Sequence, residues 1–218
     1  MTYQEMSKLL DDLCDKAGSP YFTDPEKQSF LNIAVNDYVE MEYGKFEMDG
    51  SHKLNLLPIE RPFTKANSSF LIINTDLPNF RYLTRLRGKF NSVDCNGNVG
   101  FKYVPIRPSK KDTIDVAHID PFNTPIDEDP LYTYKNTGSQ QRIIVYSATT
   151  PVELEGDYLI DPISIDLVNA PNTAFQFDDK TAMEICEMAS KKMLNRTENY
   201  NMAQSLIPEI KQLNETFQ

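Results

Sequence analysis

The stretch Thr23–Phe46, TDPEKQSFLNIAVNDYVEMEYGKF, is the part of this chain that most clearly predicts its fold. Thr23 followed three residues later by Glu26 matches a capping box, in which side chains satisfy the free backbone groups at a helix start. Asp24 before Pro25 matches an N-cap followed by proline in the first turn. The two patterns differ by one residue in where the helix begins, and both predict a helix.

Apolar residues then recur at helical spacing along this stretch, and they cover a face wider than a single stripe. Because a wide apolar face needs more than one packing partner, we expect the helix to lie against a second helix and a sheet. Ala34 and Tyr38 are predicted to be buried there. Asn32 and Glu42 fall on the polar side, and Gly44 is the first helix breaker.

The residues before this stretch predict a second helix over 3–17. Its apolar residues recur at helical spacing, and Gly18-Ser19-Pro20 ends it. The short turn between the two helices predicts a helical hairpin over 1–47. Residues 47–67 contain Gly50, Pro58 and Pro62, so we expect a loop there.

The region 68–168 has the pattern of a β structure built from hairpins. A buried strand is predicted over 69–75, and two strands over 81–90 and 100–106 are joined across an Asn-Gly turn. A second hairpin is predicted from strands over 131–135 and 142–146, and a last strand over 163–167. The segment 107–131 is rich in proline and acidic residues, which predicts an extended connection or an inserted arm.

Two further helical segments are predicted at the C-terminal end. Acidic residues introduce a helix over 178–195, which suits the helix dipole. Its apolar stripe is predicted to contain Met183, Cys186, Ala189 and Met193. A helical tail over 198–218 follows, interrupted by Pro208. The order of helices, strands and helices predicts one α+β domain over 1–218, with N- and C-terminal helices packed with a mostly antiparallel sheet of hairpins.

The composition excludes several classes of protein. The chain has 218 residues and a net charge of −10, whereas proteins that bind nucleic acid through overall charge are normally basic. The cysteines Cys14, Cys95 and Cys186 are odd in number and widely spaced, which indicates reduced thiols. We expect no signal peptide and no contact with a membrane, because no apolar run is long enough to span one.

The sequence predicts that the protein is not an enzyme. Neither His52 nor His118 has a second histidine at metal-ligand spacing, and no nucleophile elbow or glycine-rich phosphate loop is present. We therefore predict no catalytic residue, no metal site and no cofactor. The alternative is a small hydrolase in which His118 is a general base, or a metal ligand together with Asp115 and Asp120, but a solvated loop histidine explains this pattern more simply.

A basic strand is the most unusual feature of this acidic chain. Its basic residues are predicted to share one side with Leu83, opposite Tyr82, Thr84 and Leu86; they are Arg81, Arg85, Arg87 and Lys89. One interpretation is an interface with an acidic neighbour or a surface facing nucleic acid. The other is cross-strand pairing with carboxylates of the same chain. The sequence leaves both open.

Two other segments are candidate protein interfaces. The acidic residues Asp127, Glu128 and Asp129 are the predicted complement of the basic strand in a neighbouring copy. The apolar residues of the C-terminal tail could dock on a partner or pack on the chain's own core. These are Met202, Leu206, Ile210, Leu213 and Phe217.

Parts of the chain resemble the ring, or head-to-tail connector, proteins in the neck of tailed bacteriophages, especially crAss-like phages. One part is 21–39, with Tyr21-Phe22-Thr23-Asp24-Pro25-Glu26 and Phe30-Leu31-Asn32-Ile33-Ala34. The other runs from Tyr146–Pro151 and Ile165-Asp166-Leu167 to Glu184-Ile185-Cys186 and Leu194-Asn195-Arg196. These are apolar patterns, and they carry no catalytic residues.

The resemblance implies a structural virion protein. Such a protein is assembled in the bacterial cytoplasm and forms a dodecameric ring between portal and tail, around the DNA channel. Its partners are further copies of itself, the portal, and other neck and tail rings, and packaged DNA lies close by without being specifically recognised. Two alternatives come from other classes: a tail-associated binding module with exposed aromatic residues, and the small hydrolase.

Overall fold

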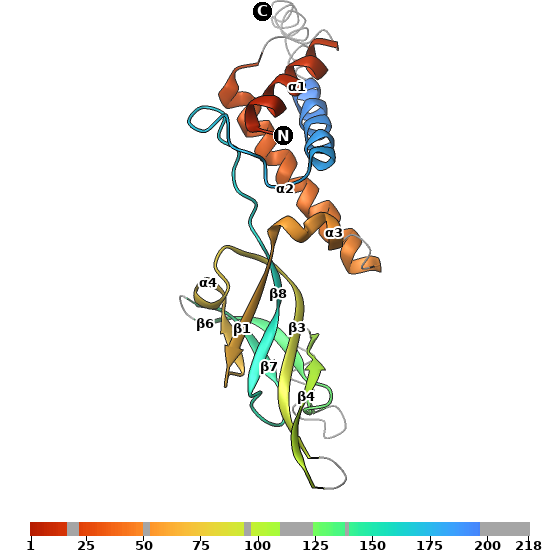
Figure 1. Ribbon diagram of the computed structural model, residues 1–218, viewed down its shortest axis with the longest axis vertical. Coiled ribbons are helices and arrows are strands. Elements are labelled where there is room, and N and C mark those ends of the chain that lie inside the picture. Colours follow the sequence, from red (N-terminus) through yellow and green to blue (C-terminus); the bar gives the residue numbers. More distant parts are fainter. Residues whose placement is uncertain (17–21, 50–52, 94–96, 110–123, 138–139, 197–218) are drawn as a thin grey trace, which may run out of the picture. The chain divides into compact units, whose positions relative to one another are not determined.

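The computed structural model describes residues 1–16, 22–49, 53–93, 97–109, 124–137 and 140–196. The chain divides into two compact units rather than the single predicted domain. The helical unit contains the described residues up to Pro58 and those from Pro162 onwards, and the sheet unit contains Ile59–Asp161. The predicted α+β class, with helices at both ends of the chain, is confirmed (Figure 1).

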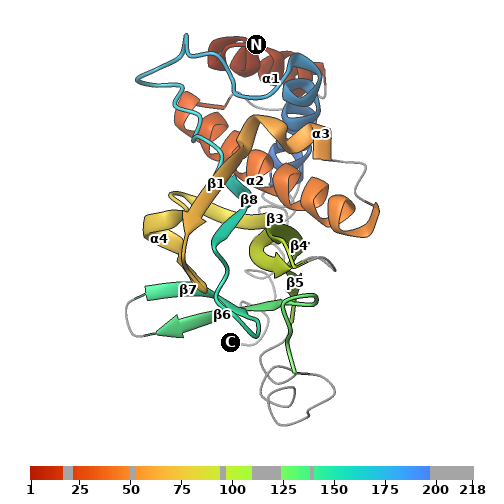
Figure 2. The same cartoon turned by 60° about the horizontal axis from the view of Figure 1, so that its bottom comes forward.

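The helical unit contains three labelled helices and one more over 179–196. The labelled helices are α1 (Tyr3–Lys16), α2 (Asp24–Asp49) and the short α3 (Lys53–Leu56). Figures 1 and 2 both show α1, α2 and the helix 179–196, in blue, lying together. The three predicted helices over 3–17, 23–46 and 178–195 are therefore confirmed within a few residues.

The start of α2 follows its sequence signal. The Thr23 N–H donates to Glu26 Oε2 at 3.0 Å, and the Thr23 hydroxyl donates to the same oxygen at 2.8 Å. These bonds favour the carboxylate and lower the pKa of Glu26, the backbone bond contributing most. Of the two hydrogen bonds that define a capping box, the one from the Thr23 N–H to the Glu26 side chain is confirmed.

The other end of α2 runs past Gly44 to Asp49. Glu42, predicted on the polar side, is buried with a side chain only 3% exposed. Its carboxylate accepts from Lys45 Nζ at 2.6 Å and from Asn55 Nδ2 at 2.7 Å, which ties α3 to α2. These contacts help to stabilise the helix beyond a glycine that costs about 1 kcal/mol relative to alanine.

Side chains from all three long helices form the core of the helical unit. Ala34 and Tyr38 are 0% and 1% exposed, as predicted. The Tyr38 hydroxyl lies 3.4 Å from Thr181 Oγ1, and its ring meets Phe177 edge-on at 6.0 Å. In the helix 179–196 the buried face includes Cys186 and Ala189, but Met183 is 51% exposed. The predicted stripe was wrong at that position, because Ala182 occupies the buried place beside it.

The predicted last strand over 163–167 is wrong. The segment is irregular, and the side chains of α2 take the place of a neighbouring strand. Asn32 Oδ1 accepts from the Ile165 N–H at 2.7 Å, and Asn32 Nδ2 donates to the Ile165 carbonyl at 3.1 Å. Gln28 Oε1 accepts from the Leu167 N–H at 3.0 Å. Side-chain amides of a helix thus satisfy backbone groups that alternation assigned to a sheet.

We expect Asn32→Leu to lower the free energy of unfolding by about 1–3 kcal/mol, since it leaves the N–H and carbonyl of Ile165 without partners. Asn36→Leu, one turn further along the exposed side of α2, is the matched control and should stay within about 0.5 kcal/mol. Urea unfolding of both variants measures the difference. Equal effects would mean that the Asn32 clamp contributes little.

The helix 179–196 begins with a side-chain cap. Asp178 Oδ1 accepts from the Thr181 N–H at 2.7 Å, and this bond lowers the pKa of Asp178 below its ordinary value of 3.8. The stabilisation is complete above the unfolded pKa and is lost as the pH falls through the lower folded pKa.

We expect Asp178→Ala to cost about 1 kcal/mol at pH 7, and Asp178→Asn, which keeps a capping oxygen, to cost less. The difference between wild type and Asp178→Asn should shrink below pH 4, where the wild-type carboxylate becomes protonated. Thermal melts at pH 7 and at pH 3 measure both effects. A gap between these two proteins that does not change with pH would contradict the assigned role.

The sheet unit contains two four-stranded sheets, with strand orders β1-β8-β3-β4 and β2-β7-β6-β5. The first sheet is antiparallel, and its strands are β1 (Glu60–Ala66), β3 (Phe80–Val93), β4 (Val99–Pro105) and β8 (Glu153–Ile160). The second consists of β2 (Phe70–Ile72), β5 (Arg107–Pro108), β6 (Leu131–Thr137) and β7 (Gln140–Tyr146), with only β5 and β6 parallel. Both predicted hairpins, β3–β4 and β6–β7, are confirmed. The turn tips 94–96 and 138–139 lie outside the described residues.

Strand β1 was predicted as part of a loop over 47–67, and that prediction is wrong. Its sequence, ERPFTKA, contains Pro62 and little apolar alternation. Such a sequence is compatible with an edge strand, where a proline on the outer side breaks no ladder hydrogen bond. The register with β8 supplies the pairing that the local sequence does not reveal.

An irregularity in β3 changes which residues face the core. The pairing of β3 with β8 shifts between Leu83 and Arg85, as in a β-bulge. Leu83 and Leu86 are therefore both buried, at 6% and 4% exposure. The prediction that Leu83 shares a side with the basic residues was wrong, because strict alternation was assumed.

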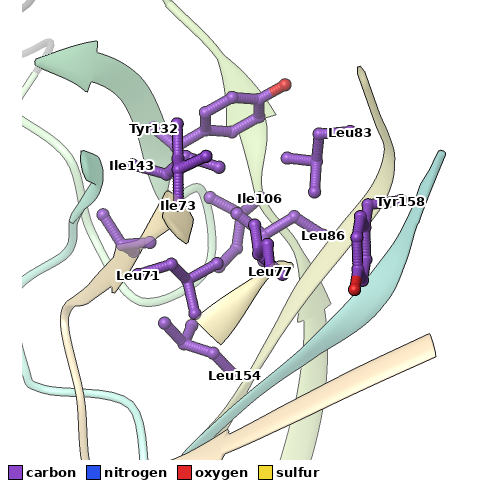
Figure 3. Close-up of a cluster of buried hydrophobic side chains, with 11 residues drawn as sticks. Leu71, Ile73, Leu77, Leu83, Leu86, Ile106, Tyr132, Ile143, Leu154 and Tyr158 are labelled. Carbon is purple, nitrogen blue, oxygen red and sulfur yellow. The ribbon is translucent and has the colours of Figure 1, made fainter. Parts of the chain in front are cut away.

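The two sheets share one hydrophobic core (Figure 3). Leu83, Leu86, Leu154 and Tyr158 come from the first sheet, whereas Leu71, Tyr132, Ile143 and Val145 come from the second. Ile73 and Leu77 come from the short helix α4 (Ile73–Asp76) and the residue after it. One face of the first sheet packs on this core, so its other face, here called the outer face, points away from the second sheet.

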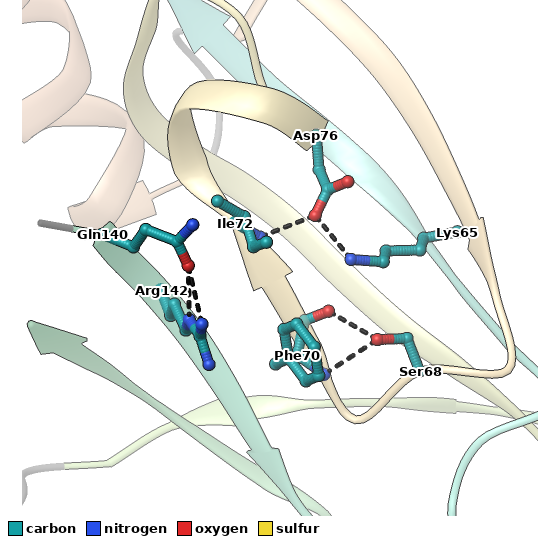
Figure 4. Close-up of polar contacts among 7 residues, drawn as sticks. All are labelled: Lys65, Ser68, Phe70, Ile72, Asp76, Gln140 and Arg142. Carbon is teal, nitrogen blue, oxygen red and sulfur yellow. Dashed lines mark hydrogen bonds and ion pairs between the residues drawn. The ribbon is translucent and has the colours of Figure 1, made fainter. Parts of the chain in front are cut away.

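Polar contacts brace the corner where the chain passes from β1 to β2 (Figure 4). Asp76 Oδ2 accepts from Lys65 Nζ and from the Ile72 N–H, both at 2.6 Å. Lys65 Nζ also lies 4.7 Å from the centre of the Phe70 ring, a cation–π contact. The edge strand β1 is thereby tied to the second sheet.

Candidate interaction surface

The basic strand meets acidic residues of its own chain. On the outer face of the first sheet, bases of β3 stand opposite acids of β8: Arg85 with Asp157 at 2.9 Å, Arg87 with Glu155, and Lys89 with Glu153 at 3.5 Å. Arg81 lies 3.9 Å from Asp161, which follows β8. Of the two interpretations left open by the sequence, cross-strand pairing is the one that the structure contains. We call the Arg85, Arg87 and Lys89 pairs the charge ladder.

We expect Arg87→Glu to lower stability by roughly 1 kcal/mol, because two carboxylates would then face each other across β3 and β8. The double variant Arg87→Glu with Glu155→Arg restores opposite charges and should recover most of the loss. Unfolding of both variants at low and high salt is the measurement, and the difference should narrow as salt screens the pair. A double variant no more stable than the single one would show that the pair itself contributes nothing.

The acidic candidates Asp127, Glu128 and Asp129 are also engaged within the chain. Asp127 accepts from the Thr149 N–H at 2.8 Å and from its hydroxyl at 2.6 Å. Glu128 pairs with Lys102 of β4, whose hydrogen bond is the main cause of the lowered pKa of Glu128. Asp129 holds the Arg107 guanidinium and raises the pKa of that group. These acids fasten the segment before β6 to β4, to β5 and to the loop between β7 and β8.

The remaining predicted candidates lie outside the described residues. They are the tail residues Met202, Leu206, Ile210, Leu213 and Phe217, and both histidines, His52 and His118. The interface role of the tail therefore stays a prediction.

An exposed apolar strip on β4 is the surface feature that the sequence analysis did not single out. Val99, Phe101 and Tyr103 are 78%, 57% and 51% exposed, and Pro105 continues the row. Lys89 Nζ lies 4.7 Å from the Phe101 ring centre, and Arg87 lies 5.0 Å from that of Tyr103. The alternation of these residues was visible in the sequence, but their outward direction was not, because either face of a hairpin can be the buried one.

The β4 strip also lies at an edge of the first sheet, with no strand of the described residues beyond it. The Ile106 N–H donates to the Leu86 carbonyl at 2.9 Å, so the even-numbered residues of β3 from Leu86 direct their backbone groups toward β4. Tyr103 stands opposite Lys89 and Phe101 opposite Asn91, which are the alternate residues. In an antiparallel pair, such residues point their N–H and carbonyl groups away from each other. Tyr103 and Phe101 therefore present backbone groups along the outer edge.

A pocket of about 410 Å³ beside β7 is lined mainly by hydroxyl-bearing residues, among them Ser69, Tyr146, Ser147 and Thr149. Within the described part of the chain, no group of three or more histidine, cysteine or acidic residues could hold a metal ion. The predicted absence of catalysis remains a prediction.

Comparison with models of known protein families gives no match to this chain, and no curated protein sequence matches it either. Among the helices of the described residues, none combines the length and the apolar character needed to cross a membrane.

Proposed function

We propose that this chain is a structural protein of the neck of a tailed bacteriophage, in which twelve copies form a ring between portal and tail. The proposal originates in the resemblance of two stretches, 21–39 and 146–196, to ring proteins of crAss-like phages. In this role the chain contributes contacts and shape rather than a reaction, and packaged DNA passes through the ring.

The observation that carries the proposal is the packing of the first stretch on that part of the second which belongs to the helical unit, from Pro162 onwards. Asn32 binds Ile165 across 133 positions of sequence, and the Tyr38 hydroxyl lies beside Thr181. Cys186, within the second stretch, directs its thiol to the Met6 carbonyl of α1 at 3.7 Å. Two apolar patterns that match a family only by chance need not pack against each other in the folded chain. The contacts between them therefore support the resemblance.

The charge of the chain is compatible with a channel wall. A ring that bound DNA tightly would hinder packaging and ejection, and a subunit with a net charge of −10 repels the phosphate backbone overall. The exposed β4 strip adds a surface suited to protein contacts, because exposed apolar patches commonly mark interaction sites.

The test is the number of copies in purified virions. Quantitative mass spectrometry with isotope-labelled peptides should give one copy of this chain for each copy of the portal protein. A value near one per virion, or absence from virions, would overturn the proposal. Cryo-electron microscopy of the neck then identifies the ring.

A second candidate is a tail-associated binding module for sugars. Exposed Phe101 and Tyr103 favour it, since sugars stack on aromatic rings. However, Lys89 and Arg87 already lie over these rings, which reduces the ring area open to a ligand. Glycan-array binding by a monomer that Phe101→Ala abolishes would support this candidate over the ring.

A further inference from the structure

Charge is distributed unusually over the outer face of the first sheet. Residues that stand opposite each other in adjacent antiparallel strands share a face, so Ala66, Glu153, Lys89 and Tyr103 form one row across all four strands. Thr64, Glu155, Arg87 and Pro105 form the next. In both rows the charged residues lie on the two central strands and neutralise each other. The residues that the two edge strands contribute to these rows are uncharged.

In these two rows, charge does not protect the edges of the sheet, and Pro62 and Pro105 are the only edge-protecting prolines of the two edge strands on this face. Soluble proteins commonly place charged side chains on edge strands, because an uncharged edge invites pairing with another chain. On this face of the two edge strands, Glu60 at the start of β1 is the one charged residue among those described. The other seven are uncharged and exposed: Val99, Phe101, Tyr103 and Pro105 of β4, and Pro62, Thr64 and Ala66 of β1.

In the part of the chain that the structure describes, no strand lies on the outer side of β1 either. The Asn67 N–H donates to the Val152 carbonyl at 2.8 Å, so Asn67 and the alternate residues Lys65 and Phe63 direct their backbone groups toward β8. Thr64 and Ala66 then direct theirs outward. Pro62 occupies an outward position as well, where its missing N–H removes no hydrogen bond within the chain.

We propose that copies of this chain join head to tail through these two edges, with β4 of one copy pairing with β1 of the next. The inference rests on the proposed ring function and names the contact that builds the ring. The occupant of each edge is a second copy of this chain.

Strand direction and side-chain size agree with this pairing. β1, β8, β3 and β4 alternate in direction, so β4 and β1 are antiparallel, and copies in the same orientation would continue the antiparallel pattern. The large side chains of Phe101 and Tyr103 would lie beside the small ones of Thr64 and Ala66. Two different edges form a heterologous contact, which closes into a ring when the rotation between copies permits it.

Added charge at either edge should prevent assembly. We expect Tyr103→Lys and Thr64→Lys each to weaken self-association at least tenfold in mass photometry and analytical ultracentrifugation, with unchanged thermal unfolding. Met183→Lys is the matched control, because Met183 has the same exposed fraction as Tyr103 but lies on the helix 179–196. If both edge variants assemble like wild type, the proposal is overturned.

Cysteine cross-linking identifies the strands that meet. In a Cys95→Ser background, Tyr103→Cys is combined in turn with Thr64→Cys and Ala66→Cys, which covers the two registers that place Tyr103 opposite a small β1 residue. Directly opposed antiparallel residues lie about 5.5 Å or less apart at Cα, within the range for a disulfide. Mild oxidation of one double variant should produce a ladder of covalent oligomers, whereas each single variant should stay monomeric on a denaturing gel.

Each other result counts against the edge pairing. Dimers from Tyr103→Cys alone would indicate a symmetric β4–β4 contact instead. A wild-type ring without cross-links in either double variant would overturn the pairing while the ring function stands. A wild-type chain that stays monomeric at every concentration also overturns the pairing, and the copy number in virions then decides the ring function separately.

Discussion

Ala34→Asp is expected to destabilise the helical unit by about 3–5 kcal/mol, because it places a carboxylate without a partner in a site that is 0% exposed. Ala34 lies on α2, four residues before Tyr38, whose hydroxyl lies beside Thr181 in the helix 179–196. A charged side chain there must either lose its hydration or separate the helices. The loss is a large part of the stability of a typical domain.

Urea unfolding followed by circular dichroism measures this effect. Two further variants serve as a control and as a milder substitution. Ile33→Asp changes the neighbouring residue, which is 44% exposed, and should cost less than about 1 kcal/mol. Ala34→Ser adds a small uncharged group and should fall between the two if Ala34→Asp does not fold. A soluble Ala34→Asp protein with the wild-type melting temperature would show that the helix packing is wrong.

Gly156→Ala is expected to have the second largest effect, about 3 kcal/mol, at the upper end of the usual range for overpacking. A Cβ atom on Gly156 would lie 2.0 Å from the backbone oxygen of Arg85 and 3.0 Å from the Phe63 ring. Backbone in the middle of a sheet cannot rotate aside as a side chain can. The substitution must therefore separate β8 from β3, where the charge ladder is formed.

Gly100→Ala is the matched control in the same sheet. Its new Cβ would approach only Ser92 Oγ, at 3.8 Å, which is ordinary contact. We expect this variant to unfold like wild type within about 0.5 kcal/mol, or to be slightly more stable because alanine restricts the unfolded chain. Equal melting temperatures for Gly156→Ala and Gly100→Ala would contradict the close approach of β3 and β8.

The sequence predicted the candidate surface only in part. The concentration of bases on β3 was visible, but their partners on β8 lie more than sixty positions away, and no local pattern states that register. Asp127 and Glu128 were placed in an interface with another copy, whereas Thr149 and Lys102 of the same chain bind them. The fold determines which distant residues form ion pairs. The composition of one strand cannot show whether its partners lie in the same chain or in another copy.

Local signals by themselves determined the long helices and the two hairpins of this protein. The Thr23–Glu26 cap, the apolar spacing through Ala34 and Tyr38, and the Asn-Gly turn each act over a few residues, so helices and hairpins followed from the sequence. The α+β class followed from their order.

Only the tertiary structure decided how those elements are partnered. Alternation over 163–167 predicted a strand, but Asn32 and Gln28 of α2 bind its backbone. A backbone segment forms hydrogen bonds with the groups that the fold brings within reach, and these need not belong to a strand. Proline in β1 argued for a loop, although at an outer edge its missing N–H costs nothing. The bulge in β3 turned Leu83 inward, and the open edges became visible only once the strand order was known. Burial, ion pairing and edge exposure depend on contacts between residues that are distant in sequence. These contacts form only in the folded chain, so no local sequence pattern reveals them.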